Sequence, residues 1–441
     1  MRNIILPAIL FAISTACTSV PASAQLAPGE RTIFTTVEKH FKEDVALLEA
    51  MVNINSGTHN HAGVRAVGDL LIPEFEALGF TAEWIDQANV ERAGHLFLRH
   101  EGAPDAPNML LIGHLDTVFE PSSPFQSFAR EGDTAIGPGV VDDKGGIVVI
   151  LSALRAMQAA GTLADANIVV ALTGDEEDAG QPIAQSRADL VAAGQWADVA
   201  LGFEGLAIRE GKDMGVVARR SSNSWTLTVT GESGHSSGIF REGVGYGAIY
   251  ELARILDAFR TQLPEENLTY NVGFLAGGTP AQMGADGLSA TTRGKANIIP
   301  DSALAFGDLR TISQEQTDRT VAAMQAIVDE HLPGTDASIE FAFRYPPMPP
   351  TEANRALLAR LNAINADLGM EAMEEYPPAL RGAADISFVA PYTDGLAGMG
   401  PAGGGSHAPG ETLDLTTLAR QAQRAAILMS RLTSEGYSRA D

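Results

Sequence analysis

Short apolar runs alternate with helical patterns in the first half of the chain. Five apolar positions recur at helical spacing near the start: Val37, Phe41, Val45, Leu48 and Val52. A second helical pattern covers residues 67–78 and ends before Gly79. Three continuous apolar runs have the length of buried strands, at 109–112, 168–172 and 199–201, and a helical pattern covers 147–160. This order predicts an α/β fold with a parallel sheet covered by helices on both faces.

The pattern changes near residue 218, where period-two alternation begins. The segments that follow predict the order strand, helix, strand, strand, helix, strand: 225–229, 249–259, 270–274, 304–309, 321–328 and 339–343. This order forms a two-layer unit by itself, so we expect an inserted ferredoxin-like domain at 218–346. Prolines within 346–350 mark the return to the first domain, which we assign to 25–217 and 347–441. A helix at 354–368 and a glycine-rich tail complete that domain.

Residues 1–24 have the composition of a secretory signal peptide. Arg2 supplies a positive charge, the apolar stretch 4–16 is too short to span a bilayer, and Ala22-Ser23-Ala24 fits a cleavage site. We therefore expect a periplasmic or secreted protein whose mature chain starts near Gln25. The alternatives are an N-terminal anchor and a degenerate lipoprotein site at Cys17.

Composition limits the partners and the metal ligands. The chain is 45% apolar and 19% charged, which is ordinary for a globular protein, and no run after residue 24 is long enough for a membrane span. Its net charge of -25, from 55 acidic and 30 basic residues, argues against nucleic acid or anionic membrane as a partner. Cys17 is the only cysteine, so after cleavage any metal must be held by His, Asp and Glu.

Acidic and histidine residues follow each of the three predicted buried strands. The segments are His114-Leu-Asp116, Gly174 to Asp178, and Phe203-Glu204, and Asp142-Asp143 precedes the helix at 147–160. Ligands bind beyond the carboxyl ends of strands in open α/β sheets. Each motif alone could be a capped turn, a helix start or a solvated loop. Together they bury several carboxylates, which a divalent cation would stabilise, and His407 in a glycine-rich loop offers a further ligand.

These spacings resemble one known family. The succession H-x-D, G-x-G-x-x-D-x-K-G-G, D-E-E, F-E and G-x-x-x-H is similar to the M20 family of dinuclear zinc peptidases and amidohydrolases, especially its glutamate carboxypeptidase branch. The likeness covers residues 30–430. It implies an α/β, phosphorylase/hydrolase-like zinc exopeptidase domain with a mixed central sheet, and an inserted lid and dimerisation domain. It also implies two Zn²⁺ ions per subunit, with five ligands: His114, Glu204, Glu177, His407 and a bridging Asp142.

The resemblance implies roles for further residues. Asp116 would accept a hydrogen bond from the far nitrogen of His114 and fix its tautomer. Glu176 would be the general base that takes a proton from water and later delivers it to the leaving amine. His235 would stabilise the tetrahedral oxyanion, commonly from the other subunit of a dimer. Two residues resemble those that hold the free α-carboxylate of the substrate: Asn297 and Arg310.

The expected activity is hydrolysis of an amide beside a free α-carboxylate, with release of a C-terminal amino acid, glutamate being favoured. The substrate would be a small peptide or N-acyl amino acid. The alternatives are an N-acyl-amino-acid deacylase or dipeptidase of the same family and, more remotely, a non-catalytic peptide-binding protein. Side-chain specificity stays open, because residues 382–385 read Gly-Ala-Ala-Asp instead of a G-G-T-D-like stretch and His235 is followed by Ser-Ser-Gly instead of Ala-Gly. Arg219-Arg220 is either a contact for an anionic side chain or solvated surface.

Overall fold

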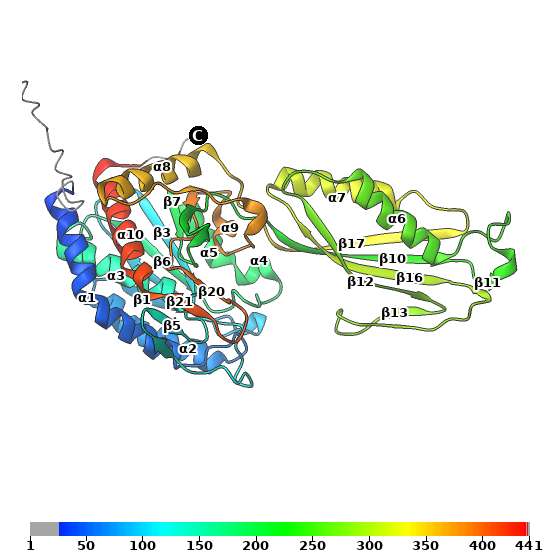
Figure 1. The fold of residues 1–441 in the computed structure, drawn as a ribbon, viewed down its shortest axis with the longest axis horizontal. Helices are drawn as coiled ribbons and strands as arrows, with labels where there is room; N and C mark the ends of the chain where they lie inside the picture. Colours follow the sequence, from blue (N-terminus) through cyan, green and yellow to red (C-terminus); the bar gives the residue numbers. More distant parts are fainter. Residues whose placement is uncertain (1–25, 438, 440–441) are drawn as a thin grey trace, which may run out of the picture.

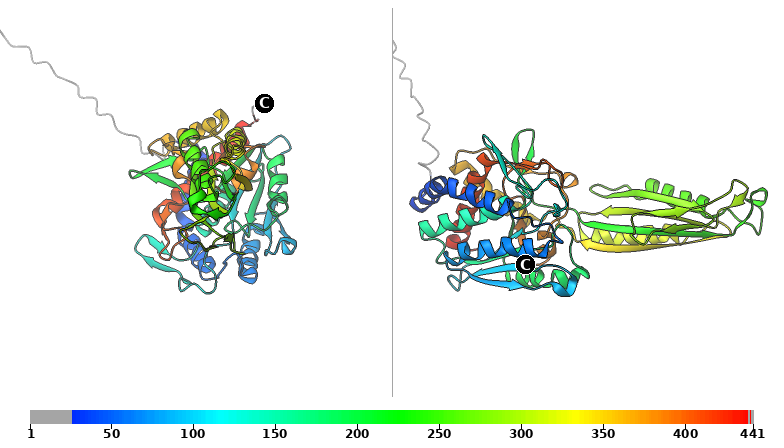
Figure 2. Two further views of the ribbon diagram at one scale, coloured as in Figure 1. Left: turned by 90° about the vertical axis from the view of Figure 1, so that its right-hand side faces the viewer. Right: turned by 90° about the horizontal axis from the view of Figure 1, so that it is seen from below.

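The computed structural model describes residues 26–437 and 439, arranged in two lobes. Figures 1 and 2 show a larger lobe built from the two ends of the chain and an elongated lobe built from its middle. The predicted signal peptide, including Cys17, lies outside the described residues. Within the described residues no helix is both long and apolar enough to cross a membrane.

A six-stranded mixed sheet forms the centre of the larger lobe (Figure 1). Its strands, in spatial order, are β1 (Thr81–Ile85), β2 (His95–His100), β6 (Asn167–Thr173), β3 (Asn108–His114), β7 (Val199–Gly202) and β19 (Asp394–Leu396). The three strands predicted from apolar runs, β6, β3 and β7, are parallel, as is β19. β2 runs antiparallel to both of its neighbours, β1 and β6, and the apolar runs did not predict β1 or β2.

Helices cover both faces of this sheet. Met109 and Leu111 of β3 point into one core, and the alternate residues Leu110 and Ile112 point into another. The first core is covered by α1 (Pro28–Val52), α2 (His61–Glu76), α3 (Lys144–Ala160), α8 (Glu352–Asp367) and α10 (Leu415–Glu435), and the second by α5 (Ala188–Trp196) and α9 (Ile386–Val389). The prediction of a glycine-rich tail was incomplete, because α10 follows the glycine-rich loop and packs against α1 and α3.

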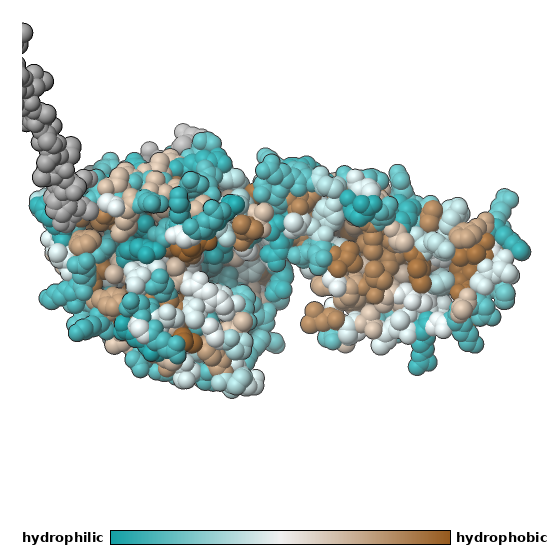
Figure 3. Space-filling view, viewed as in Figure 1, coloured by the Kyte–Doolittle hydropathy of each residue, from teal (hydrophilic) through white to brown (hydrophobic). Residues whose placement is uncertain are grey.

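The elongated lobe has a four-stranded antiparallel sheet with two helices. The sheet order is β12 (Thr269–Gly278), β16 (Ser302–Arg310), β10 (Ser222–Gly231) and β17 (Thr335–Tyr345). Trp225, Leu227 and Val229 alternate into a core shared with α6 (Ala248–Gln262) and α7 (Gln314–Val328). This is the ferredoxin-like order expected from the sequence. Figure 3 shows apolar surface on this lobe. Three exposed apolar residues lie on its strands: Val272, Leu275 and Phe343.

Short elements complete the two lobes. A small sheet joins β20 (Gly403–Gly404), β21 (Thr412–Asp414), β5 (Thr134–Ile136) and β4 (Ala129–Glu131), and another joins β18 (Glu374–Glu375), β9 (Lys212–Gly215) and β8 (Ala207–Arg209). The elongated lobe adds the pairs β11 (Gly234–His235) with β15 (Ile298–Ile299) and β13 (Ala281–Met283) with β14 (Ala290–Thr292). The remaining turns are α4 (Ile183–Ser186), η2 (Ala88–Val90), η3 (Ser236–Gly238) and η4 (Pro378–Leu380).

Candidate metal centre

The predicted ligands converge at the carboxyl edge of the central sheet. His114 is the last residue of β3, Glu177 follows β6 and Glu204 follows β7, and these three strands run parallel. Asp142 lies in the turn before α3, and His407 lies in the loop between β20 and β21. Parallel strands that end together bring residues distant in sequence to one place.

Asp142 lies between two imidazoles. Its Oδ1 atom is 3.1 Å from Nε2 of His114, and its Oδ2 atom is 3.2 Å from Nε2 of His407. Nε2 of His407 is also 3.1 Å from Oε2 of Glu177. Ligand atoms of His114, Asp142 and Glu177 all lie within 4.8 Å of one another. A carboxylate that gives one oxygen to each side has the arrangement of a bridge between two cation sites.

Glu411 fixes the loop of His407 beside the turn of Asp142. Its carboxylate accepts hydrogen bonds from the backbone N–H groups of Gly139, Val141 and Asp142, at 3.0, 2.8 and 3.0 Å. Burial raises the pKa of Glu411 to about 7. His407 itself has φ of 65°, a left-handed conformation that is uncommon outside glycine. No role was predicted for Glu411, and the only signal for one in the sequence is its place at the end of the His407 motif.

Asp116 contacts both His114 and the loop that carries Glu176 and Glu177, which we call the glutamate loop. Its buried carboxylate accepts hydrogen bonds from Oγ1 of Thr58 at 2.6 Å and from the backbone N–H groups of Glu176 and Glu177 at 3.0 and 3.1 Å. Nδ1 of His114 is 3.1 Å from the backbone oxygen of Asp116 and 3.4 Å from its carboxylate. Asp116 therefore lies against the far nitrogen of His114, mainly through its backbone oxygen. The carboxylate has the additional task of holding the loop.

The electrostatics of the cluster favour a cation. Hydrogen bonds to Asp142 and Glu177 raise the pKa of His407 to about 11. Burial opposes the charged form of His114, but hydrogen bonds to Asp116 and Asp142 outweigh it and raise that pKa well above its usual value. Burial raises the pKa of Glu177. Carboxylates this close need positive charge beside them, and imidazole nitrogen with carboxylate oxygen is an ordinary donor set for a divalent metal.

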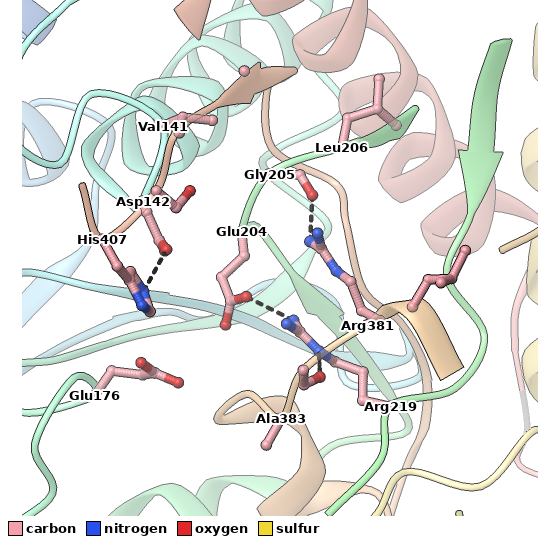
Figure 4. A pocket seen from close by; sticks show the side chains of 14 residues that line it. Val141, Asp142, Glu176, Glu204, Gly205, Leu206, Arg219, Arg381, Ala383 and His407 are labelled. Carbon is pink, nitrogen blue, oxygen red and sulfur yellow. Dashed lines mark hydrogen bonds and ion pairs between the residues drawn. The ribbon is translucent and has the colours of Figure 1, made fainter. Parts of the chain in front are cut away.

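Glu204, the fifth predicted ligand, pairs with an arginine instead of with another predicted ligand. Its Oε2 atom lies 2.7 Å from Nη1 of Arg219. Figure 4 shows this pair beside Asp142 and His407, so the carboxylate remains near the cluster while paired with a guanidinium. The donors present thus fit a divalent metal on the side of His407 and Glu177, and Glu204 stands close to the side of His114.

A cavity of about 300 Å³ opens beside the cluster. Asp142, Glu176, Glu204 and His407 line one part of it, and Arg219, Arg381 and Ala383 line another (Figure 4). Burial, together with the charge of Glu204, raises the pKa of Glu176 well above its usual value. A carboxylate whose pKa is raised binds a proton more readily than an exposed one, which suits a role in proton transfer.

A buried network that was not predicted supports the backbone of Glu176. Arg187 places Nη1 2.6 Å from Asp175 and Nε 2.8 Å from Asp385, and its Nη2 donates to the hydroxyl of Tyr345 at 3.0 Å. That hydroxyl donates to the carbonyl oxygen of Glu176 at 2.7 Å. Tyr345 is the last residue of β17, so the network joins the elongated lobe to the glutamate loop. The two aspartates lie in motifs noted above, whereas nothing in the sequence marked Arg187.

The structure does not gather the other three predicted residues, His235, Asn297 and Arg310, at the cluster. His235 in β11 is exposed, and its Nδ1 lies 2.9 Å from Oγ of Ser237. Asn297 is its neighbour, because β11 pairs with β15 and the carbonyl oxygen of Asn297 accepts from the N–H of Ser236 at 3.0 Å. Figure 1 places β11 at the end of the elongated lobe that is remote from the larger lobe. Arg310 ends β16 and pairs with Asp308 at 3.0 Å.

Asn297 and Arg310 are separated by the length of a strand. β15 and β16 follow one another, and the nine residues of β16 separate its start near Asn297 from its end at Arg310. At about 3.3 Å per residue this distance is roughly 25–30 Å. One small carboxylate therefore cannot contact both side chains within a single chain.

Comparison with known proteins places the chain among hydrolases. The sequence model of "Peptidase family M20/M25/M40" matches residues 110–431. Carboxypeptidase G2 of Pseudomonas sp. (strain RS-16) is 26% identical over 369 residues, which cover 82% of each chain. A succinyl-diaminopimelate desuccinylase of Acidiphilium cryptum (strain JF-5) is 26% identical over 387 residues, covering 85% of this chain and 95% of that relative.

A solved structure shares the fold. The YXEP protein of Bacillus subtilis, described as a dinuclear metal binding peptidase from the M20 family, superposes with a TM-score of 0.61 over 90% of this chain and 99% of that one. The two sequences are 15% identical, so this likeness concerns the fold alone.

Proposed function

Because the chain belongs to peptidase family M20/M25/M40, whose members are metal-dependent hydrolases, we propose that it is an exported dinuclear zinc enzyme. It cleaves an amide bond beside a free α-carboxylate and releases a C-terminal amino acid, with glutamate the first candidate. The observation that carries this proposal is Asp142 held between His114 and His407, with Glu177 and Glu176 beside it.

The five ligands divide between two sites that share one carboxylate. His114 and Glu204 would hold one ion, Glu177 and His407 would hold the other, and Asp142 would serve both sites. Divalent cations bound there would supply Lewis acidity toward the scissile carbonyl and the attacking water. Zinc suits this set of nitrogen and oxygen donors.

Glu176 performs the proton transfers. Its carboxylate lines the cavity, and the backbone around it is fixed by Asp116 on one side and Tyr345 on the other. It takes a proton from the attacking water and gives that proton to the amine that leaves. Burial and the charge of Glu204 raise the pKa of Glu176, which makes its carboxylate a stronger base.

A second copy of the chain completes the site. His235 and Asn297 lie far from the metal centre of their own chain, and His235 is exposed. We therefore infer a homodimer formed through the elongated lobe, in which His235 of the partner subunit stabilises the oxyanion. Arg310 holds the α-carboxylate of the substrate. Light scattering on the eluted protein tests the dimer, and a fully active monomer at micromolar concentration would refute it.

The second candidate is an N-acyl-amino-acid deacylase or dipeptidase. One similar protein is named a carboxypeptidase and another a desuccinylase, and both reactions hydrolyse an amide. A purely peptide-binding protein is disfavoured, because the chain retains both the ligand set and Glu176.

Product identification separates these activities. The mature chain loaded with zinc is incubated with folate-type, N-acyl amino acid and dipeptide substrates, and the released products are identified by mass spectrometry. The same protein dialysed against a chelator is the control. We expect metal-dependent release of an amino acid with a free α-carboxylate. A protein that binds no zinc and hydrolyses none of the three classes would refute the proposal.

Export is tested separately. Fractionation of the source cells, with sequencing of the N-terminus of the recovered protein, is expected to find a mature chain starting near Gln25 outside the cytoplasm. A lipid attached at Cys17 would support the lipoprotein alternative. A cytoplasmic protein that retains residues 1–24 would refute export.

A further inference from the structure

Arginines form the wall of the cavity across from Asp142 and His407. Arg381 follows the short helix η4, and Arg219 precedes β10 where the chain enters the elongated lobe. Both side chains line the cavity, and Figure 4 shows them beside Glu204 and Gly205. Neither arginine is one of the five proposed metal ligands, and the proposed proton-transfer residue is Glu176.

The two arginines differ in their partners. Arg219 pairs with Glu204 at 2.7 Å and donates Nε to the carbonyl of Gly382 at 2.8 Å. Arg381 donates Nη2 to the carbonyl of Gly205, while its Nε atom is buried and has no hydrogen-bond partner among the described residues. No carboxylate in the described part of the chain forms an ion pair with Arg381. A guanidinium in this position is costly unless an anion joins it.

Positive charge accumulates around the loop that carries Arg381. Arg220 donates Nη2 to the carbonyl of Ala379, two residues before Arg381, at 2.9 Å. Burial and the charge of Arg310 lower the pKa of Arg220. Burial and the charge of Arg219 lower the pKa of Arg381 to about 10. Like charges therefore face one another on both sides of the loop.

The local charge has the opposite sign to the whole protein. Four arginines gather here, Arg219, Arg220, Arg310 and Arg381, and two of them have carboxylate partners, Glu204 and Asp308. The other two, Arg220 and Arg381, form no ion pair within the described residues, although Asp308 acts on Arg220 and Glu204 and Asp142 act on Arg381 at longer range, in a chain whose net charge is -25. Such a local field attracts anionic ligands to one part of an otherwise acidic surface.

We propose that Arg381, flanked by Arg219, binds a second carboxylate of the substrate, separate from the α-carboxylate assigned to Arg310. This inference rests on the proposed function and narrows it to amides that carry at least two carboxylates. The second carboxylate belongs either to the side chain of the released amino acid or to the far end of a dicarboxylic acyl group. A planar guanidinium binds a carboxylate through two parallel hydrogen bonds, for which Nε and one Nη are suited.

A matched substrate set identifies the source of that carboxylate. The four compounds are N-succinyl-glutamate, N-succinyl-glutamine, N-succinamoyl-glutamate and N-succinamoyl-glutamine, in which each acid is compared with its amide. The acid and the amide are compared at two positions, the end of the acyl group and the side chain of the released amino acid. At one of these positions we expect the zinc-loaded enzyme to prefer the acid over the amide by about tenfold or more in kcat/KM, as for a charged hydrogen-bond pair. Arg381→Gln is expected to reduce that preference to about threefold or less, and Arg381→Lys to retain part of it.

A binding measurement separates this subsite from the hydrolytic activity. Glutarate and its monoamide glutaramate are titrated calorimetrically into the zinc-loaded protein, and glutarate is expected to bind about tenfold more tightly. Arg381→Gln should remove the difference, whereas Arg209→Gln, a half-exposed arginine elsewhere on the larger lobe, should preserve it. If glutarate is favoured through Arg381 but no substrate is cleaved, the subsite stands and the proposed function fails. If the wild-type protein cleaves amides yet does not distinguish glutarate from glutaramate, the subsite is refuted.

Discussion

Replacing Asp116 by asparagine tests whether its carboxylate organises the metal centre. In the native chain Oδ1 accepts from the N–H of Glu176, and Oδ2 accepts from Thr58 and from the N–H of Glu177. The residue is fully buried, so water cannot replace these contacts. Asparagine keeps one oxygen and presents an NH₂ group at the other position. In either orientation at least one backbone N–H then faces another donor.

The structure sets the size of the effect. A hydrogen bond to a charged group contributes about 1.5–3 kcal/mol, and a buried donor without an acceptor costs about 1–3 kcal/mol. We expect Asp116→Asn to lower the free energy of unfolding of the metal-free protein by roughly 2–4 kcal/mol. Because the same carboxylate sets the position of Glu177 and lies near Nδ1 of His114, zinc affinity should fall by about 10–100-fold.

Two measurements check this expectation. Urea unfolding of the metal-free protein gives the stability change, and competition with a chromophoric chelator gives the zinc affinity. Asp133→Asn is the matched control, because that side chain is 73% exposed and lies in a turn outside the metal centre. If Asp116→Asn kept the free energy of unfolding within about 0.5 kcal/mol and the zinc affinity within about twofold of the wild type, as the control should, the organising role of Asp116 would be wrong.

Three further substitutions, one of them with a matched control, test other parts of the structure. Glu176→Gln should lower kcat by about 10²–10⁴-fold with the zinc content unchanged, and equal activity would exclude a proton-transfer role. Tyr345→Phe removes the hydroxyl that donates to the carbonyl of Glu176, so it should destabilise the protein by about 1–2 kcal/mol and lower kcat. Tyr250→Phe, at a side chain 53% exposed, should change neither value. Burial raises the pKa of Asp44, so its stabilising effect is present at acid pH and is lost as pH rises through its folded-state pKa. Urea unfolding between pH 4 and 7 should therefore show the stability advantage of the wild type over Asp44→Asn decreasing with pH, and a constant difference would contradict the raised pKa.

The meeting of His114, Asp142, Glu177 and His407 could be predicted because these residues follow local patterns. His114 and Glu177 come directly after apolar runs that form parallel strands, so their meeting at one sheet edge follows from topology. Asp142 and His407 lie in glycine-rich turns whose spacing resembles a known family. The contact between Glu204 and Arg219 could not be predicted in this way, because it depends on how the chain passes between the lobes.

Other features depend on contacts that leave no local pattern. Arg187 is an ordinary arginine in the sequence and becomes buried only where α4 and α5 meet the loops of Asp175 and Asp385. The helix α10 carries apolar residues at helical spacing, including Leu418 and Met429, yet the glycine-rich stretch before it suggested a tail. The remote position of His235 follows from the pairing of β11 with β15, which involves only two residues on each side.

The bond from Tyr345 to the glutamate loop limits how these enzymes can be recombined. The elongated lobe joins the larger lobe through chain segments near β10 and β17, and the last side chain of β17 reaches into the catalytic half. A chimaera that exchanges this lobe for one from another relative would therefore transplant a support of Glu176, the proposed general base, along with the new domain. Grafts that end one residue earlier, or that close with a residue lacking the phenol, should fold and bind metal but turn over slowly.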